Sequence, residues 1–520
     1  MSYRDYRPLA VMVTLGIASI AAVPARADVT LPAFFSNGVV LQRDRPVPVW
    51  GTADPGESVT VTFDEKSETT VAGQDGSWKV ALKPHAAAEA LTLTIAGKNT
   101  VTLQNVAVGE VWFCSGQSNM GFQVGQSRNA AAEIASAADP GLHLFTVARN
   151  PIDKPQKDVK GSWSASSPES VRTFSAVAYF FGRELRQKLR VPVGLIHSSW
   201  GGTSAEAWTS ASALSAKPEL KTLITDWDKR IATYSEEDSR KQYDTVTLPQ
   251  WQERVTKAQA EGKPAPARPA APVAPAISPN RPANLFNGMV NPVIPYAIKG
   301  VIWYQGESNA GRAEQYRTLF PTLIRDWRER WGQGDLPFLW VQLANYRAVQ
   351  TAPVENDGWP LLREAQQMTL SLPHTGMATA IDLADAENPG DIHPKNKQDV
   401  GKRLALVALA KEYRQNVVSS GPVFDKMTVK NSKVRLTFKH TDGGLKPHGE
   451  KLQGFAIRGT DGVWRWADAV IDGSAVVVSH PSVAIPVTVR YGWASNPIGN
   501  LYNGAGLPAL PFRTGKPSLP

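Results

Sequence analysis

A serine stands at the end of an expected buried strand, within residues 115–120, whose sequence is Ser-Gly-Gln-Ser-Asn-Met. The preceding residues 106–113 are mostly apolar, which is typical of such a strand. Where the chain turns out of a sheet, Ser118 presents its hydroxyl and its own backbone N–H to one point in space. Acyl transfer to serine needs both groups there. The pattern therefore predicts a nucleophilic serine.

The general base for this serine is predicted at His393, in a Gly-Asp-Ile-His-Pro segment. This segment follows an expected strand ending at Asp382 and precedes an expected helix beginning near Lys397. A loop at that edge of a sheet can place an imidazole over a serine on another strand. His197 competes because it also ends a strand, but no acidic residue follows closely enough to orient it.

An acidic residue must orient the base, and Asp391 is the first choice because it lies two residues before His393. Asp382, Asp385 and Glu387 are alternatives nearby. Each of these carboxylates can instead cap a turn.

Donors for the developing oxyanion have three candidate sources. The first is the backbone N–H of Ser118. The second is Gly201 and Gly202 after a strand end, where no Cβ separates the backbone from a ligand. The third is a side-chain amide, either Gln305 at the terminus of an apolar strand or Asn309 one turn later. Position favours Gln305.

The sequence gives no support to several other chemistries. It has no Gly-x-Ser-x-Gly elbow, no His-Glu-x-x-His, no metal-spaced Cys/His cluster and no Walker loop. We expect neither a metal nor another cofactor. The single cysteine, Cys114, excludes an intramolecular disulfide and is expected to be a small buried hydrophobe.

Composition favours a carbohydrate ligand over a nucleic acid. The formal charge of +9 is spread over 520 residues without a basic run, so we expect no nucleic-acid partner. Sixteen tryptophans suggest stacking on sugar faces. Trp200, Trp303 and Tyr304 are candidates for a sugar platform, although each can equally be core. Arg363 is a candidate partner for a substrate carboxylate.

The first residues read as a cleaved secretory signal. Arg4 and Arg7 precede an apolar run over residues 9–23, and Ala-Arg-Ala follows at 25–27. The run is short for a bilayer span and breaks at Pro24. We expect residues 1–27 to be removed, leaving a periplasmic or secreted protein without a membrane anchor.

The rest of the chain divides into three parts, which differ in the spacing of their apolar residues along the sequence. Residues 28–104 alternate over short segments with glycine turns, as in an antiparallel β-sandwich. Residues 105–415 alternate strands with helices, which indicates an α/β domain with a parallel sheet. An insertion at about 211–284 is first polar and helical, then proline-rich and extended. Residues 416–520 return to a β-domain.

Four segments in order resemble the sialate O-acetylesterase family, a branch of the SGNH-hydrolase superfamily that contains bacterial carbohydrate acetylesterases. The segments are residues 109–112 with 116–120, then 200–203, 303–309 and 391–394. Residues 40–43 and 491–493 resemble the flanking β-regions of the family.

The resemblance implies a flavodoxin-like three-layer domain that removes acetyl groups from sugar hydroxyls. It implies that Ser118 is the nucleophile, His393 the base and Asp391 its partner. Gly202 and an amide of the third segment would complete the oxyanion hole. The sequence departs from the superfamily in having Gly-Gln-Ser for Gly-Asp-Ser, and in spacing the acid two residues before the histidine where three is usual.

The substrate stays open between O-acetylated sialic acid and a hemicellulose such as acetylxylan, because both would use the same catalytic residues. The rival of a different class is a non-catalytic glycan-binding protein. The presence of both Ser118 and His393 counts against it.

Overall fold

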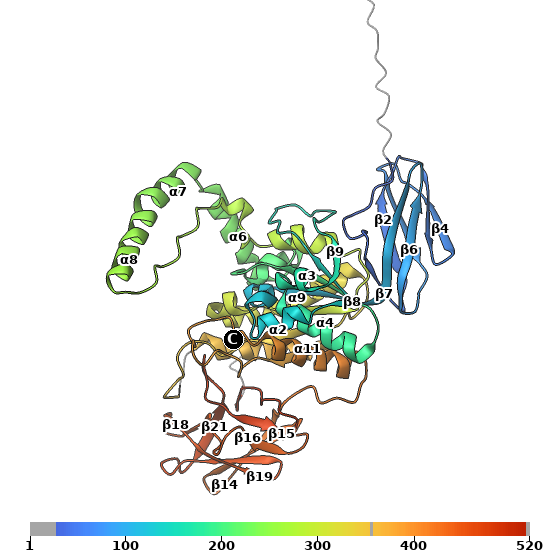
Figure 1. The fold of residues 1–520 in the computed structure, drawn as a ribbon. Coiled ribbons are helices and arrows are strands. Elements are labelled where there is room, and N and C mark those ends of the chain that lie inside the picture. Colours follow the sequence, from blue (N-terminus) through green and yellow to red (C-terminus); the bar gives the residue numbers. More distant parts are fainter. Residues whose placement is uncertain (1–27, 354–356, 516–520) are drawn as a thin grey trace, which may run out of the picture.

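The structure is a computed structural model that describes residues 28–353 and 357–515 (Figure 1). The expected signal, residues 1–27, lies outside these ranges. Within them, no helix has both the length and the apolar character needed to cross a membrane.

A mixed sheet forms the centre of the molecule, and β7 is its middle strand. Both neighbours of β7 are parallel to it, and only the edge strand β9 runs antiparallel to its partner in the order β13-β12-β11-β7-β10-β8-β9. The expected α/β class is therefore confirmed. The strands are β7 (Thr100–Gly116), β8 (Asp139–Thr146), β9 (Trp163–Ser166), β10 (Val193–Ser199), β11 (Gly300–Tyr304), β12 (Phe338–Gln342) and β13 (Thr375–Thr379).

Helices contact both faces of this sheet. Successive residues of a strand point to opposite faces. On β7, Trp112 packs against Phe181 of α4, with ring centroids 5.0 Å apart, while Phe113 packs 5.6 Å from Trp327 of α9. The longer helices here are α4 (Ala176–Leu189), α9 (Ala313–Trp331), α10 (Gly358–Met368) and α11 (Lys397–Lys411). Shorter helices are α1 (Ser118–Gly121), η1 (Val124–Gln126), α2 (Ala130–Ala135), α3 (Pro168–Arg172), η2 (Ala205–Trp208), η4 (Pro275–Ile277), η5 (Phe286–Val290), η6 (Asn291–Val293), η7 (Glu307–Arg312) and η8 (Thr369–Ser371).

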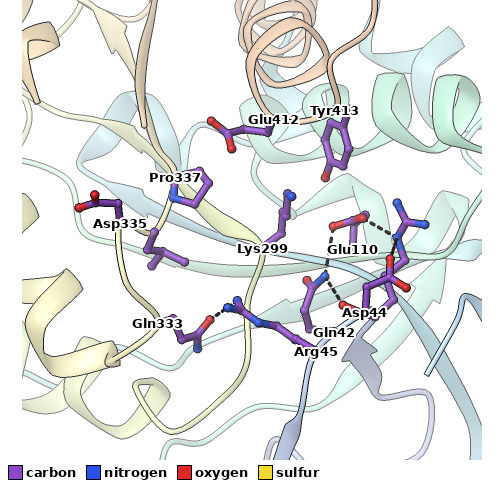
Figure 2. A pocket seen from close by; sticks show the side chains of 12 residues that line it. Gln42, Asp44, Arg45, Glu110, Lys299, Gln333, Asp335, Pro337, Glu412 and Tyr413 are labelled. Carbon is purple, nitrogen blue, oxygen red and sulfur yellow. Dashed lines mark hydrogen bonds and ion pairs between the residues drawn. The ribbon is translucent and has the colours of Figure 1, made fainter. Parts of the chain in front are cut away.

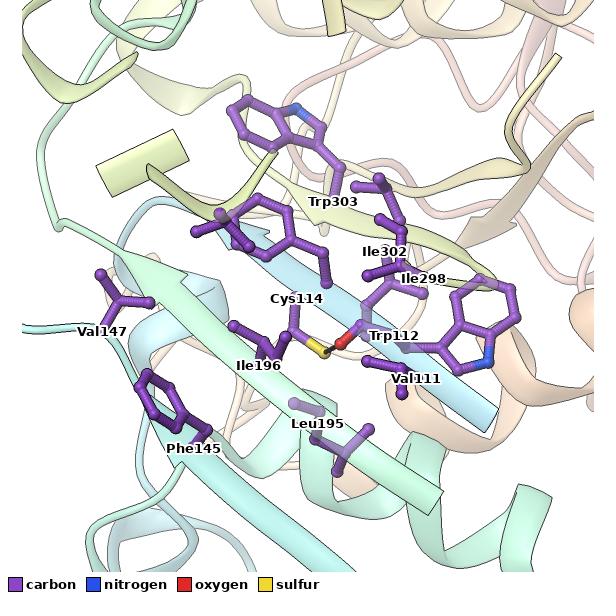
Figure 3. Packing of buried hydrophobic residues seen from close by; sticks show 14 of the residues in the cluster. Val111, Trp112, Cys114, Phe145, Val147, Leu195, Ile196, Ile298, Ile302 and Trp303 are labelled. Carbon is purple, nitrogen blue, oxygen red and sulfur yellow. Dashed lines mark hydrogen bonds between the residues drawn. The ribbon is translucent and has the colours of Figure 1, made fainter. Parts of the chain in front are cut away.

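Buried aliphatic and aromatic side chains fill the space between the sheet and its helices (Figure 3). Parallel strands covered on both faces are buried along their whole length, as β10 and β11 are here. β11 is apolar almost throughout, while β10 ends in His197, Ser198 and Ser199. Cys114 belongs to this core and is completely buried, with its thiol directed at the carbonyl of Trp112. The expectation that it is a buried hydrophobe is confirmed.

The N-terminal β-region shares a strand with the central sheet. The boundary expected between residues 104 and 105 falls inside β7, which pairs with β6 at its start and with β10 and β11 at its end. The remaining strands here are β1 (Val40–Gln42), β2 (Val47–Thr52), β3 (Ser58–Phe63), β4 (Lys66–Val71), β5 (Ser77–Leu82) and β6 (Ala88–Ala96).

The insertion forms an arm, seen in green in Figure 1, whose outer helices project away from the central domain. Its helices are α5 (Ala211–Ser215), α6 (Pro218–Ala232), α7 (Glu236–Gln242), η3 (Tyr243–Thr247) and α8 (Leu248–Ala260). The proline-rich segment runs back along them, because Tyr243 donates to the carbonyl of Pro269 and Trp251 to that of Pro266. The helical and extended halves expected for the insertion are both present.

The C-terminal region is rich in β-structure and has its own apolar core. Its strands form two four-stranded sheets and one pair of strands. They are β14 (Val423–Lys430), β15 (Lys433–Lys439), β16 (Leu445–Pro447), β17 (Phe455–Gly459), β18 (Trp464–Trp466), β19 (Asp468–Asp472), β20 (Ala475–Ser479), β21 (Pro486–Tyr491), β22 (Leu501–Asn503) and β23 (Phe512–Arg513).

Candidate active site

Three central strands end at the same level. Gly116, the last residue of β7, pairs with Ser199 at the end of β10 and with Tyr304 at the end of β11. The segments that follow these strands therefore begin side by side at the carboxyl edge of the sheet. Ligand sites of parallel sheets lie at this edge.

A tight turn at Gly116 carries the chain from β7 to the serine. Gly116 has φ +142°, and a Cβ there would lie 2.1 Å from the carbonyl oxygen of Tyr304. The turn is held on both sides, since Gln117 donates its N–H to Tyr304 and Trp200 donates to Gly116. Only glycine fits this backbone, and Ser118 follows two residues later as the first residue of α1.

Ser118, His393 and Asp391 form a connected row. His393 Nε2 lies 2.8 Å from Ser118 Oγ, and His393 Nδ1 lies 3.2 Å from Asp391 Oδ1. The same carboxylate oxygen accepts the backbone N–H of His393 at 2.9 Å. Asp391 thus fixes both the loop and the ring, and the row has the geometry of a nucleophile, a base and the acid that orients the base.

Asp382, one of the alternative acids, and His197, the alternative base, have other partners. Asp382 accepts two hydrogen bonds from Arg403, at 2.6 and 2.8 Å, and a third from Tyr502. His197 is buried with its Nε2 2.7 Å from Ser199 Oγ, and burial lowers its pKa to about 4. The structure brings neither of these groups to the Ser118–His393 pair.

The electrostatic surroundings favour the neutral form of His393. Partial burial lowers its pKa, the nearby charge of Lys397 lowers it further, and Asp391 acts in the opposite direction. A neutral imidazole at moderately acidic pH can accept the serine proton.

A buried polar network beneath the histidine was missed from the sequence. Lys397 is fully buried and donates to Asn119 Oδ1 at 2.6 Å. Asn119 in turn donates to Glu307 Oε1 at 2.6 Å and to the carbonyl of Ile392 at 3.1 Å. The network therefore joins the serine segment, the third motif segment and the histidine loop.

Burial displaces both charged members of this network toward neutrality. It lowers the pKa of Lys397 to about 7 and raises that of Glu307 above its ordinary value. One signal could have identified Lys397, because it is the first residue of α11, where the helix dipole disfavours a cation. A lysine at such a position is therefore expected to form a specific interaction that offsets this cost.

Two of the expected oxyanion donors have open N–H groups. In the described part of the chain, neither the Ser118 nor the Gly202 backbone N–H donates to another group. Gly201 lies against the serine, since a Cβ on it would be 3.2 Å from Ser118 Cβ. Gly202 adopts φ +73° beside it.

The two candidate side-chain amides, Gln305 and Asn309, have different partners. Both N–H groups of the Gln305 amide are used, by Thr203 O at 3.2 Å and by Asn309 Oδ1 at 2.6 Å. Asn309 donates one N–H to Glu206 at 3.0 Å. Gln305 thus positions Asn309, whose second N–H has no acceptor among the described residues.

Three of the four candidate substrate contacts are buried, which for Trp303 and Tyr304 agrees with the core alternative. Trp303 and Tyr304 are completely buried on β11, where the sheet is covered on both faces. Arg363 is also completely buried and donates to the backbone carbonyls of Leu343, Ala344, Ala494 and Ser495. Trp200 remains partly exposed, and Arg149 lies 5.3 Å above its ring.

The described residues contain no cluster of three or more His, Cys, Asp or Glu side chains that could hold a metal ion. Acyl transfer uses a serine, a histidine and an aspartate that are linked by hydrogen bonds, together with backbone N–H groups that can stabilise an oxyanion. The structure has these groups together at the carboxyl edge of its parallel sheet. Fold and site together define a carboxylic ester hydrolase of the serine type.

Comparison with known proteins gives the family. Residues 280–410 match the family model described as carbohydrate esterase, sialic acid-specific acetylesterase. The chain is 30% identical to the rat sialate O-acetylesterase, over 97% of this chain and 98% of that protein, and 31% identical to the mouse protein, over 92% and 93%. The chain belongs to the sialate O-acetylesterase family of carbohydrate esterases.

A solved structure agrees with this assignment. A carbohydrate acetylesterase from Xanthomonas citri superposes with a TM-score of 0.79 at 38% identity, covering 94% of this chain and all of that one. The similarity therefore includes the β-regions as well as the central domain.

Proposed function

We propose that this chain removes acetyl groups from sugar hydroxyls through an acetyl-enzyme on Ser118. The observation that carries the proposal is the 2.8 Å contact between Ser118 Oγ and His393 Nε2, with Asp391 on the other ring nitrogen. Membership of the carbohydrate esterase family indicates that the acyl group is acetyl and that the alcohol is a sugar hydroxyl.

The reaction has two steps that mirror each other. Ser118 Oγ attacks the acetyl carbonyl while His393 takes its proton, and the imidazolium then protonates the departing sugar oxygen. A water molecule, deprotonated by His393, attacks the acetyl-serine, and the imidazolium returns the proton to Ser118 Oγ as the ester bond breaks and acetate leaves. The N–H groups of Ser118 and Gly202 and the second N–H of Asn309 stabilise the oxyanion in both steps.

The finer identity of the enzyme is part of the proposal. The relatives named as sialate O-acetylesterases support O-acetylated sialic acid as a substrate, and acetylated hemicellulose is the second candidate. The positive, apolar and small-residue order of residues 1–27 supports export to the periplasm or the medium. The contacts of α4 and α9 with opposite faces of β7 support the three-layer, flavodoxin-like arrangement.

Acetate release tests the proposal. Wild-type protein and Ser118→Ala are compared on p-nitrophenyl acetate, acetylated xylan and O-acetylated sialic acid. We expect Ser118→Ala to lose at least about a hundredfold in kcat, because nucleophile and base act as a unit. Equal rates in the two proteins would refute the mechanism, and binding of glycans without any acetate release would favour the non-catalytic alternative.

A further inference from the structure

A cavity of about 340 Å³ opens next to the catalytic serine. Gly202 and Ser308 line its near side. Gly202 follows the glycine that touches Ser118, and the Ser308 N–H donates to the side chain of Gln117, the residue before that serine. The cavity is of the size that small-molecule sites in proteins have, and a group bound in it would adjoin an acetyl group positioned on Ser118.

The far wall of this cavity comes from the insertion. Leu223, Trp227 and Arg230 line it from α6, the helix at the base of the arm in Figure 1. Their spacing of four and three residues places them on one face of the helix. Leu223 and Trp227 are half-buried, and the Arg230 guanidinium lies 4.1 Å from the centre of the Trp227 ring.

The charges around the cavity are balanced. They come from two arginines and two carboxylates, namely Arg230, Arg312, Glu206 and Asp226. Arg312 is paired with Glu206, and Asp226 lies 3.6 Å from Lys229. The lining has as many carboxylates as arginines, and Arg230, which forms no ion pair among the described residues, lies over the Trp227 ring. An aromatic wall with a few polar groups suits the apolar face and the hydroxyls of a neutral sugar.

We propose that this cavity is a binding subsite for a neutral sugar residue adjoining the acetylated one, built by α6 of the insertion. The inference rests on the proposed function and adds the class of substrate, an acetylated neutral oligosaccharide longer than one ring. Trp227 supplies the surface on which the second ring lies, and Arg230 holds the indole in place. The insertion would thereby contribute to substrate specificity.

The test compares three acetyl esters that fill the site to different extents: p-nitrophenyl acetate, an O-acetylated methyl xyloside and acetylated xylotetraose. We expect Trp227→Ala to lower kcat/KM on the tetraose at least tenfold, mainly through KM, with less than a twofold change on the two smaller esters. Trp227→Phe keeps an aromatic ring and should recover most of the loss. Trp251→Ala, on α8 farther along the arm, is the matched control and should change none of the rates.

Two outcomes would overturn the subsite. One is wild-type enzyme that hydrolyses the tetraose no better than the single ring, with Trp227→Ala unchanged on both. The other is a selective loss on O-acetylated sialic acid in Arg230→Gln, which would make the cavity a carboxylate site. Failure of the proposed function itself has a different signature, because p-nitrophenyl acetate would then be hydrolysed equally by wild type and Ser118→Ala.

Discussion

Lys397 is a lysine in an unusual environment, because lysine side chains are normally exposed to solvent. It is completely buried, donates to Asn119, and lies 4.6 Å from the centre of the Phe122 ring, which itself stacks on the His393 imidazole. Its charge disfavours a second positive charge on His393. We infer that Lys397 is a positioning residue that keeps the base neutral and the serine segment in place.

Lys397→Met should move the acidic limb of the kcat/KM profile to higher pH. Removing a positive charge beside His393 removes one cause of its lowered pKa, so that protonation inactivates the base at a higher pH than in the wild type. We also expect kcat to fall about tenfold at the optimum, because Asn119 loses the partner that orients it. Initial rates on p-nitrophenyl acetate across pH measure both effects. Lys402→Met, an exposed lysine on the same helix, is the control, and a folded Lys397→Met with an unchanged acidic limb would contradict the role.

The turn from β7 into α1 is the element that places the nucleophile. Gly116 combines a positive φ with a backbone approach to Tyr304 that leaves no room for a side chain. The same turn is held by hydrogen bonds to the ends of β10 and β11. The turn therefore sets where the chain leaves the sheet, two residues before Ser118.

Gly116→Ala should destabilise the protein and inactivate it. Backbone strain and overpacking each amount to roughly 1–3 kcal/mol, so we expect the free energy of unfolding to fall by about 3 kcal/mol. We expect kcat to fall about a hundredfold as Ser118 shifts. Urea denaturation and esterase rates measure the two. Gly311→Ala, where a Cβ would meet open space, should leave both within error, and wild-type stability in Gly116→Ala would show that the turn is not constrained.

The central domain and the C-terminal β-region are joined through α10. Arg363 donates to carbonyls that follow β12 and, on the other side, to those of Ala494 and Ser495. Its neighbour Glu364 accepts two hydrogen bonds from Arg513, both at 2.8 Å. The C-terminal region is thus attached at α10, and Arg363 serves this attachment instead of binding substrate.

Arg363→Met should reduce stability without changing substrate affinity. The variant removes four hydrogen bonds and leaves the carbonyls of Leu343 and Ala494 without a donor among the described residues, while those of Ala344 and Ser495 keep the N–H groups of Trp359 and Tyr346. We expect a loss of about 3–5 kcal/mol in the free energy of unfolding. We expect KM for O-acetylated sialic acid to stay within twofold of the wild type. Arg325→Met, an exposed arginine on α9, should change stability by less than about 0.5 kcal/mol. A stable Arg363→Met with a raised KM would restore the substrate-binding interpretation.

The periodicity of the apolar residues predicted the order of strands and helices. The positions of the motifs after expected strands predicted that Ser118, Asp391 and His393 meet, because parallel strands bring their carboxyl ends to one edge of the sheet. They could not distinguish a buried aromatic from an exposed one. Trp303 and Tyr304 follow the same motif pattern whether they contact a sugar or α9. Nor could they identify the Lys397–Asn119–Glu307 network, whose members lie far apart in sequence and carry no shared periodicity.

The central claim is that Ser118 is the nucleophile and His393 activates it. A fluorophosphonate probe that reacts with activated serines, followed by peptide mapping with mass spectrometry, tests this directly. We predict one adduct, on Ser118, that appears in step with the loss of acetyl esterase activity and is absent in His393→Ala. Loss of activity with the adduct on another residue, or full labelling of Ser118 in His393→Ala, would contradict the account.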